Sequence, residues 1–390
     1  MKKLAIITTH PIQYNAPLFR MLHHKERVEI KVFYTWSQTE QGVKYDPGFH
    51  KEIEWDIPLL TGYPYTFVEN ISTDPGSGHY KGIDNPSLIE EITGWGPDAV
   101  LIYGWNFKSH FAAMKHFHGK LPVMFRGDST LMDEQFGIKK ILRRLWLRRV
   151  FSYVDLGLYA GRANLAYFKA HGLHQHQLVY MPHTVDNERF AKTENTLHAG
   201  AALRQQLNIP GEALVFLFAG KLEEKKQPGL LAEAFVKLNA HDAYLIIAGS
   251  GALESKLLSL YGKHPNIRFT GFVNQQQMPA LYASCDVFVL PSKGPGETWG
   301  LAINEAMAAG KAILASDACG ATADLVINGL NGYVFAKNDG NDLFECMEHL
   351  ADNRNKIEEM GKESEKIIGP YNFSKGAHAI GLATGVLTDK

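Results

Sequence analysis

The sequence predicts an α/β protein of two domains, each built on a parallel β-sheet. Short apolar runs alternate with segments of helical periodicity, the order expected of strand–helix–strand units. A length of 390 residues, of which 45% are hydrophobic, suits two packed cores of ordinary size. A polar region separates two series of such runs. We therefore place the first domain at residues 1–190, a linker at 191–210 and the second domain at 211–370.

The first series starts with a buried strand and a helix. Apolar runs predict strands at 4–7, 28–33, 99–103, 121–125 and 154–159, and helical spacing predicts a helix around 16–22. Between the second and third of these strands lies an irregular stretch, 36–80, rich in Gly, Pro, Tyr and Asp. Loops of that length are usually functional or mobile.

The second series repeats this organisation. Apolar runs predict strands at 214–218, 245–248, 267–273, 288–290 and 312–315. Between the last two, apolar residues recur at roughly helical spacing from Leu301 until Gly310 ends the pattern. The region 288–316 is thus a strand, a glycine-rich loop, a helix and a strand, which is a βαβ unit.

Composition excludes several classes of function. A net charge of −1 implies no global attraction to nucleic acid. Three cysteines without C-x-x-C spacing argue against a disulfide framework or zinc site and favour a reducing compartment, so we expect a cytoplasmic protein. No apolar run approaches the ~20 residues that span a bilayer. The N-terminal apolar run is only about five residues long, so it predicts a first strand rather than a signal peptide.

Two acids in the region 288–316 are candidates for ligand binding. Glycines from Gly294 to Gly300 fall at the strand-to-helix turn, where free backbone N–H groups and a helix N-terminus attract anions. Glu297 lies in this loop, and Glu305 lies on the helix among apolar and small neighbours. Because an unpaired buried carboxylate is costly, we expect Glu305 to meet polar groups of a ligand.

This region closely resembles the E-x7-E signature of the retaining glycosyltransferases of family 4. The matching residues follow in family order: Glu297, Trp299-Gly300, Glu305 and the Ala-Met-Ala-x-Gly run at 306–310. The resemblance implies the GT-B fold, in which two Rossmann-like domains face each other across a cleft and a C-terminal helix, here 371–390, crosses back to the first domain. It also implies that Glu297 contacts hydroxyls of a donor sugar and that Glu305 grips the ribose of its nucleotide.

The helix start in this loop belongs to the same implied site. By the same resemblance, the nucleotide-sugar donor meets Trp299, Gly300 and Leu301, where the helix N-terminus favours negative charge.

A second cluster of charge follows the strand 214–218. The family pattern there is Gly-Arg-Leu-x-x-x-Lys, whose two cations neutralise the donor diphosphate. This chain has Lys221 in the Arg position and Lys226 in the Lys position, and we assign both a catalytic role by resemblance. Lysine acts as a point charge without the bidentate fork of arginine. The alternative is a charged turn on the surface.

Two further turns are secondary candidates. A strand at 245–248 runs into Gly249-Ser250-Gly251, a weak signal alone. By resemblance, Gly249 and Gly251 lie by the nucleotide, and the backbone at Phe272 and Val273 receives the base. Backbone contacts leave little side-chain code, so the identity of the base is not readable.

The first domain is expected to bind the acceptor, whether glycan, glycolipid or small molecule. His10 and Tyr14 follow the first strand and are candidates to face the acceptor, although an ordinary packed loop is an equal alternative. Many relatives place a histidine after the strand 121–125, where this chain has Arg126 and Asp128. We expect Asp128 to orient an acceptor hydroxyl or Arg126 to bind a phosphate or carboxylate.

A basic helix is predicted at 138–151. Apolar residues recur at helical spacing at 138, 141, 142, 145, 146 and 150, and six lysines and arginines accompany them without an acid. Such a helix suits peripheral contact with an anionic membrane. The alternative is a solvated basic face above a core stripe.

The reaction expected is sugar transfer from a nucleotide-diphosphate donor to an acceptor hydroxyl, with retention of anomeric configuration. Because the sequence has no D-x-D triplet, we expect no metal and no cofactor besides the donor substrate. Two alternatives remain: a GT-B epimerase acting on the sugar nucleotide alone, and a non-catalytic subunit that binds a nucleotide sugar.

Overall fold

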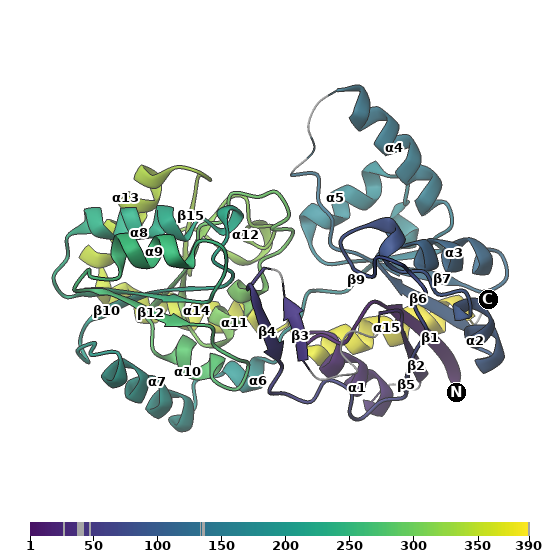
Figure 1. Cartoon of the computed structure of the whole chain (residues 1–390), viewed down its shortest axis with the longest axis horizontal. Coiled ribbons are helices and arrows are strands. Elements are labelled where there is room, and N and C mark those ends of the chain that lie inside the picture. Colours follow the sequence, from purple (N-terminus) through teal and green to yellow (C-terminus); the bar gives the residue numbers. More distant parts are fainter. Residues whose placement is uncertain (26–27, 37–42, 47, 133, 135–136, 389–390) are drawn as a thin grey trace. The chain divides into compact units, whose positions relative to one another are not determined.

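The computed structural model describes residues 1–25, 28–36, 43–46, 48–132, 134 and 137–388. Its chain divides into two compact units, each with its own parallel sheet (Figure 1). Unit 1 comprises Met1–Gly42, Pro58–Thr184 and Phe373–Lys390, and unit 2 comprises Val43–Ile57 and Val185–Asn372.

Unit 1 contains a seven-stranded sheet in the order β5-β2-β1-β6-β7-β8-β9. All the paired strands are parallel. The strands are β1 (Lys2–Thr8), β2 (Val28–Tyr34), β5 (Tyr65–Phe67), β6 (Ala99–Tyr103), β7 (Val123–Arg126), β8 (Leu156–Tyr159) and β9 (Leu178–Tyr180). Every strand predicted for the first domain is present, whereas β5 and β9 were not predicted.

Helices cover both faces of this sheet. Successive side chains of a strand point to opposite faces, so Leu4 and Ile6 join one core, with Phe19 and Ile380, while Ala5 and Ile7 join the other. The helices of unit 1 are α1 (Ala16–Lys25), α2 (Leu88–Trp95), α3 (Lys108–Phe117), α4 (Ile138–Phe151), α5 (Arg162–Ala170) and α15 (Phe373–Thr388).

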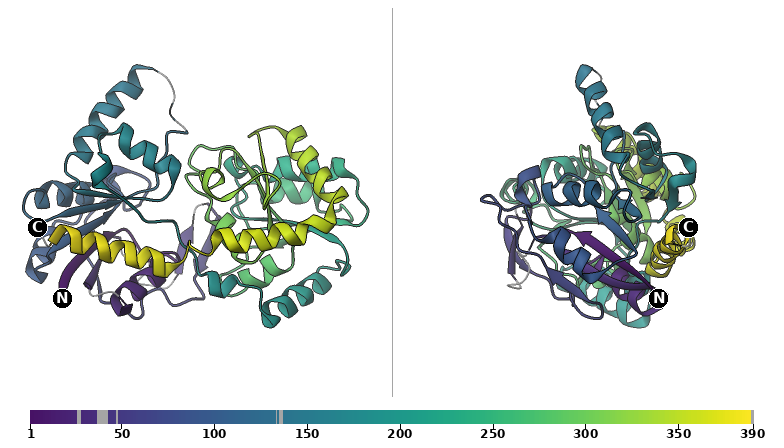
Figure 2. Two further views of the ribbon diagram at one scale, coloured as in Figure 1. Left: turned by 180° about the vertical axis from the view of Figure 1, so that it is seen from behind. Right: turned by 90° about the vertical axis from the view of Figure 1, so that its right-hand side faces the viewer.

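The C-terminal helix α15 returns to unit 1. It packs against α1 and is the yellow helix that ends at the C-terminus in Figure 2. The resemblance implied this return for residues 371–390, of which the last two lie outside the described residues.

Unit 2 contains a six-stranded parallel sheet in the order β12-β11-β10-β13-β14-β15. The strand order changes direction between β10 and β13. In open α/β sheets, ligands bind beyond the carboxyl ends of strands at such a point. The strands are β10 (Leu214–Ala219), β11 (Ala243–Ala248), β12 (Ile267–Gly271), β13 (Val287–Leu290), β14 (Ala312–Ser316) and β15 (Gly332–Phe335).

The helices of unit 2 pack around this sheet. They are α6 (Asn187–Phe190), α7 (Glu194–Gln206), α8 (Pro228–Leu238), α9 (Glu254–Tyr261), α10 (Met278–Ala283), α11 (Leu301–Ala308), α12 (Thr322–Leu325), α13 (Gly340–Asp352) and α14 (Ile357–Ile368).

The region 191–210, predicted as a linker, instead contains helix α7 of unit 2. A Cβ on Gly200 would lie 2.7 Å from the backbone carbon of Ala283, so α7 packs closely on α10. Arg204 also donates to both carboxylate oxygens of Asp286, at 2.9 and 2.8 Å. Because α7 buries little besides Gly200, its sequence is polar enough to resemble a linker.

An antiparallel hairpin of β3 (Val43–Asp46) and β4 (Lys51–Glu54) was not predicted. In the chain it lies between β2 and β5 of unit 1, within the irregular stretch 36–80, yet its contacts place it in unit 2. Across the described parts of the chain, no helix is both long and apolar enough to cross a membrane.

Candidate functional site

The loop that follows β13 holds Glu297 in a buried position. Glu297 is only 8% exposed, and its Oε2 accepts a hydrogen bond of 2.9 Å from the hydroxyl of Ser292. Gly300 ends the loop with a φ of +95°, and a Cβ there would lie 2.9 Å from a methyl carbon of Leu290. Glycine is therefore required where the chain turns into α11.

The loop after β10 approaches the loop after β13. Lys226 donates to the same oxygen of Glu297 and forms an ion pair with it. The backbone N–H of Lys293 also donates to the carbonyl of Lys225, at 2.8 Å. The structure thus joins two predicted site residues that are distant in the sequence, and it makes them partners of each other.

A third loop, after β14, fixes the position of Glu297. The N–H of Gly320 donates to the carbonyl of Glu297 at 3.1 Å, and the N–H of Ala321 donates to that of Trp299 at 2.9 Å. A Cβ on Gly320 would lie 1.8 Å from the carbonyl oxygen of Thr298, so no larger residue fits without moving the loop. Nothing in the local sequence identified this support.

Glu305 is buried, but it has a partner within the protein. Its Oε2 accepts a hydrogen bond of 2.7 Å from the hydroxyl of Tyr282 on α10. Glu305 therefore does not need a ligand as its polar partner, contrary to the prediction from sequence, although a role toward a ribose stays a prediction.

The neighbouring Trp299 is also buried. Its Nε1–H donates to Asn304 at 2.8 Å, which holds the start of α11 against the loop.

Lys221, the other predicted phosphate cation, pairs with the hairpin. Its Nζ lies 2.8 Å from Oδ1 of Asp46 and 5.1 Å from the centroid of the Phe49 ring. This pairing was not predicted because Asp46 precedes Lys221 by 175 positions.

The glycines of the turn after β11 are required by protein packing. Gly249 and Gly251 have φ values of +136° and +149°. Added Cβ atoms would lie 1.9 Å from the carbonyl oxygen of Gly220 and 2.8 Å from that of Leu222, respectively. Close approach of the β10 loop thus explains both glycines without a nucleotide. Phe272 and Val273 follow β12 and are half-buried.

The predicted acceptor residues lie in unit 1. His10 packs edge-on against Trp36, with ring centroids 5.2 Å apart, and its Nδ1 lies 3.0 Å from the hydroxyl of Thr9. Tyr14 is half-buried just before α1. These surroundings of His10 match the packed-loop alternative.

Arg126 is the last residue of β7 and is buried. Its Nη1 donates to the carbonyls of Leu158 and Met181, so it ties together the ends of β8 and β9. Burial lowers the pKa of Arg126 below its ordinary value. Asp128, two residues further on, is exposed.

His183 is a residue of this region that sequence reasoning missed. Burial, and then the charge of Arg126, lower the pKa of His183 to about 3, whereas the charge of Asp128 acts in the opposite direction. The imidazole is therefore neutral at physiological pH. Its signal in the sequence was a histidine that directly follows Pro182, just beyond the short strand β9.

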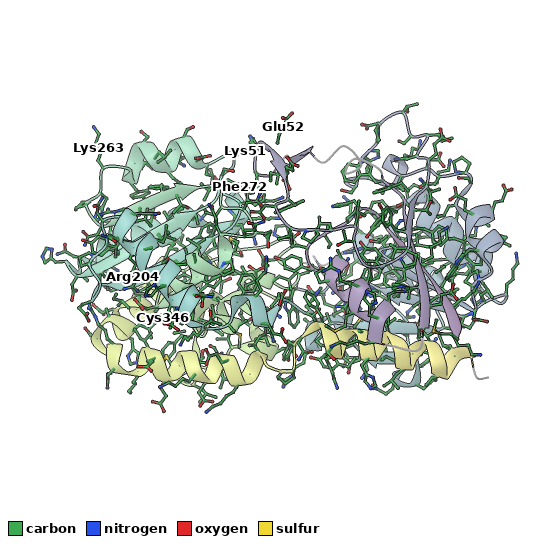
Figure 3. The ribbon with its side chains drawn as sticks, turned by 90° about the horizontal axis from the view of Figure 1, so that it is seen from below. Lys51, Glu52, Arg204, Lys263, Phe272 and Cys346 are labelled. Carbon is green, nitrogen blue, oxygen red and sulfur yellow. The ribbon has the colours of Figure 1, made fainter. Side chains whose placement is uncertain are left out.

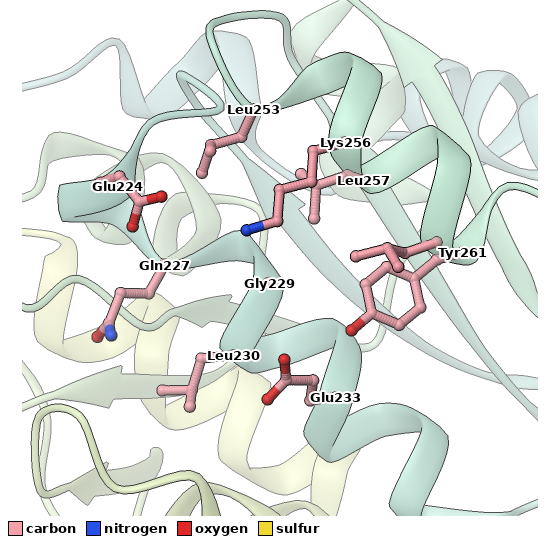
Figure 4. Close-up of a pocket in the computed structure, with 10 residues that line it drawn as sticks. Glu224, Gln227, Gly229, Leu230, Glu233, Leu253, Lys256, Leu257 and Tyr261 are labelled. Carbon is pink, nitrogen blue, oxygen red and sulfur yellow. The ribbon is translucent and has the colours of Figure 1, made fainter.

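Two cavities lie elsewhere in unit 2. One of about 250 Å³ opens between α8 and α9, where Glu233, Lys256 and Tyr261 line it (Figure 4). Another of about 440 Å³ is lined by charged side chains, including Arg204 and Lys311. None of the predicted site residues lines either cavity.

Helix α4 has an exposed apolar face. The exposed fractions are 77% for Ile138, 61% for Ile141 and Leu142, 58% for Leu145 and 47% for Trp146. The alternative of a core stripe is therefore wrong for five of the six predicted apolar positions; Val150 is the sixth and is buried, together with Leu147 and Phe151. Figures 1 and 2 show α4 extending away from the sheet of unit 1.

Glu134 partly balances the charge of this helix. It forms ion pairs with Lys140 at 3.1 Å and with Arg144 at 3.0 Å, and its own side chain is almost fully buried.

Residues 201–367 match the family model described as "Glycosyl transferases group 1". This segment is a group 1 glycosyltransferase domain. It contains Lys221, Lys226, Glu297 and Glu305, the four residues for which the resemblance made the most definite predictions.

Relatives of known sequence extend the similarity. An uncharacterized glycosyltransferase of Methanocaldococcus jannaschii is 35% identical over 140 residues, which are 35% of each chain. A GDP-mannose-dependent alpha-mannosyltransferase of Mycolicibacterium smegmatis is 29% identical over 274 residues, which are 68% of this chain and 66% of that one. The chain thus matches only part of the length of these relatives.

Solved structures match the whole chain. HepE of Anabaena, in complex with UDP and glucose, has a TM-score of 0.72 at 18% identity and covers 99% of this chain and 100% of its own. Sucrose-phosphate synthase of Thermosynechococcus elongatus has a TM-score of 0.74 at 16% identity, with 100% of both chains covered. The chain has the GT-B fold.

Proposed function

We propose that this protein is a glycosyltransferase that moves a sugar from a nucleotide-diphosphate donor to an acceptor hydroxyl with retention of configuration. The observation that carries the proposal is the pairing of Lys226 with Glu297 between the loops after β10 and β13, inside the group 1 domain. Those loops follow the strands where the sheet order changes direction, the place where α/β sheets bind ligands.

Cleavage of the donor builds negative charge on the leaving diphosphate and positive charge on the sugar. Lys221, Lys226 and the N-terminus of α11 stabilise the first charge. Glu297 accepts hydrogen bonds from hydroxyls of the donor sugar. Glu305, held by the hydroxyl of Tyr282, accepts hydrogen bonds from the ribose. For retention, the acceptor attacks from the face that the diphosphate leaves, and the leaving phosphate takes the acceptor proton.

The acceptor side of the reaction belongs to unit 1. We assign Asp128, which follows β7, and the neutral His183, which follows β9, to the orientation of the acceptor hydroxyl; Arg126, the last residue of β7, is tied to the ends of β8 and β9. We also assign Tyr14 to the acceptor side, and His10 to it only through its packing in the same loop. No metal takes part in this scheme. The three thiols and the expected reducing compartment fit a cytoplasmic enzyme.

A screen of nucleotide sugars tests the donor proposal. Since relatives include a GDP-mannose-dependent enzyme and a structure with UDP-glucose, the screen includes both, with free glucose and mannose as controls. A ligand at ~100 times its Kd adds roughly 2.7 kcal/mol of stability, a measurable rise in melting temperature. Slow hydrolysis of the stabilising donor then identifies a catalyst, whereas epimerised product identifies an epimerase. Binding without turnover in the presence of acceptor lipids and glycans would contradict the catalytic proposal.

We also propose that α4 contacts the anionic surface of a membrane. Its exposed apolar residues supply area for insertion and its lysines and arginines supply attraction to lipid headgroups. Contact of α4 with a membrane would suit a peripheral protein whose acceptor is linked to a lipid.

Vesicle binding tests the membrane proposal. Vesicles containing phosphatidylglycerol should bind the protein, and binding should weaken as salt rises. Changing Ile141, Leu142 and Leu145 to serine should abolish binding, while changing Leu258 and Leu260 of α9 to serine should not, since those two are also exposed but lie in unit 2. Equal binding of both variants would show that α4 is merely solvated.

A further inference from the structure

The hairpin β3–β4 contacts Lys221, which is predicted to receive a donor phosphate, and the turn that follows β11. Asp46 and Phe49 meet Lys221, as described above, and the hydroxyl of Ser250 donates to the carbonyl of Phe49 at 3.0 Å. A Cβ on Gly251 would lie 2.9 Å from the carbonyl oxygen of Gly48. The tip of the hairpin therefore rests on the turn between Gly249 and Gly251.

The Lys221 side chain lies flat against this tip. A Cβ on Gly48 would lie 2.5 Å from Cδ and 2.6 Å from Nζ of Lys221. No volume remains between the lysine and the hairpin backbone for a phosphate group. In this arrangement the hairpin occupies the face of Lys221 that it contacts, in place of a phosphate, and the lysine side chain is 33% exposed.

The rest of the hairpin is fastened beside the predicted base site. Lys51 lies 5.8 Å from the centroid of the Phe272 ring, and Figure 3 shows these two labelled side chains close together. Phe272 also meets Phe49 edge-on, with centroids 5.1 Å apart. At the base of the hairpin, Asn274 donates to the carbonyl of Glu54 at 2.7 Å.

Asp46 brings a negative charge to Lys221. Its Oδ1 accepts hydrogen bonds from Lys221 at 2.8 Å, from the N–H of Gly48 at 2.8 Å and from that of Phe49 at 3.2 Å. Partial burial by itself raises the pKa of Asp46, but the hydrogen bond and charge of Lys221 outweigh it and hold the pKa below its ordinary value. The carboxylate is therefore ionised at neutral pH.

We propose that the hairpin is a latch whose Asp46 carboxylate stands in for a donor phosphate on Lys221 and that a nucleoside diphosphate must displace it to bind. The inference rests on the proposed function, because it takes the donor diphosphate to bind at Lys221. The donor opens the latch by offering Lys221 a more highly charged anion, and Asp46 sets how tightly the donor must bind to do so.

Asp46→Asn tests the latch, with UDP and GDP as probes in calorimetric titrations. Removing the competing charge should lower the Kd of the nucleotide that binds by about 5-fold, in line with a partly exposed ion pair. Asp56→Asn is the matched control. Asp56 lies just after β4 and accepts from the N–H of Gln276 at 3.1 Å, so this variant makes the same change of charge away from Lys221 and should leave the Kd unchanged.

Hydrogen exchange supplies a second measurement. The N–H groups of Gly48 and Phe49 should exchange faster in wild-type protein when the nucleotide is added, because the latch has opened.

Each other result overturns a different statement. A higher Kd for Asp46→Asn than for wild type would make Asp46 a positioning residue for Lys221. An equal decrease of the Kd in Asp56→Asn would show that the effect is one of general electrostatics. An unchanged Kd, or slower exchange with nucleotide, would also refute the latch. If neither nucleotide binds wild type or Asp46→Asn, the proposed donor site itself is refuted.

Discussion

Replacing Lys226 by methionine should damage both stability and turnover, and the structure separates the two effects. Lys226 and Glu297 have side chains that are 18% and 9% exposed, so both charges are largely removed from water. Removing one partner of a buried ion pair costs about 3–5 kcal/mol, because the other charge is left without compensation. Since this pair retains some solvent, we expect a loss of about 3 kcal/mol in the free energy of unfolding.

The effect on turnover has a different origin. Lys226 is proposed to stabilise charge that develops on the leaving diphosphate, and removing one such preorganised group costs about 10²–10³ in kcat. Adding Glu297→Gln to the Lys226→Met variant removes the unpaired charge, so most of the stability should return. Turnover should not return, because the charge that faces the diphosphate is still absent.

Urea unfolding, followed by tryptophan fluorescence, and kcat with the donor found by thermal shift measure the two effects. Lys225→Met is the control, since Lys225 is more exposed and pairs with Glu223, at 3.3 Å. It should change the free energy of unfolding by at most about 0.5 kcal/mol and leave kcat near that of wild type. If Lys225→Met lost turnover while Lys226→Met kept it, the assignment of the phosphate loop would be displaced by one residue.

Three further predictions use other parts of the structure. Glu305→Gln should raise the donor KM while saturating donor restores much of kcat, because a ribose contact does not change during the reaction; a large loss of kcat at saturation would contradict this role. Activity should survive EDTA, and rescue of a lost activity by magnesium or manganese would refute metal independence. Burial lowers the pKa of His110 from 6.5 to about 4, so the unfolded chain binds the extra proton first, and His110 should contribute a loss of about 3 kcal/mol to the stability of unit 1 as pH drops from about 6.5 to about 4, in addition to the loss contributed by His183. The urea midpoint should depend less steeply on pH over this range for His110→Gln than for wild type, whereas His24→Gln, in which an exposed histidine is changed, should keep the wild-type slope.

Sequence periodicity determined the two sheets and the helix α4 because these patterns are local. Buried parallel strands are continuous apolar runs, so β1, β6, β10 and β13 could be recognised one at a time. The spacing of Glu297 and Glu305, with the residues between and after them, likewise indicated the family because the whole motif lies in one short segment, and the group 1 match includes it. Short edge strands such as β5 and β9 carry too few residues to be recognised alone.

Only the tertiary structure decided which charges meet. The pairs Lys226–Glu297 and Lys221–Asp46 join residues that are 71 and 175 positions apart, and no local pattern specifies such a contact. The hairpin could not be assigned to unit 2 from its sequence, because its partners, Ser250 and Phe272 among them, are brought to it by the sheet. Whether an apolar residue is buried also depends on what packs against it. The sequence of α4 was therefore compatible with either a core stripe or a membrane-binding surface. The fold class therefore followed from short-range periodicity, whereas the electrostatic state of the site followed from long-range packing.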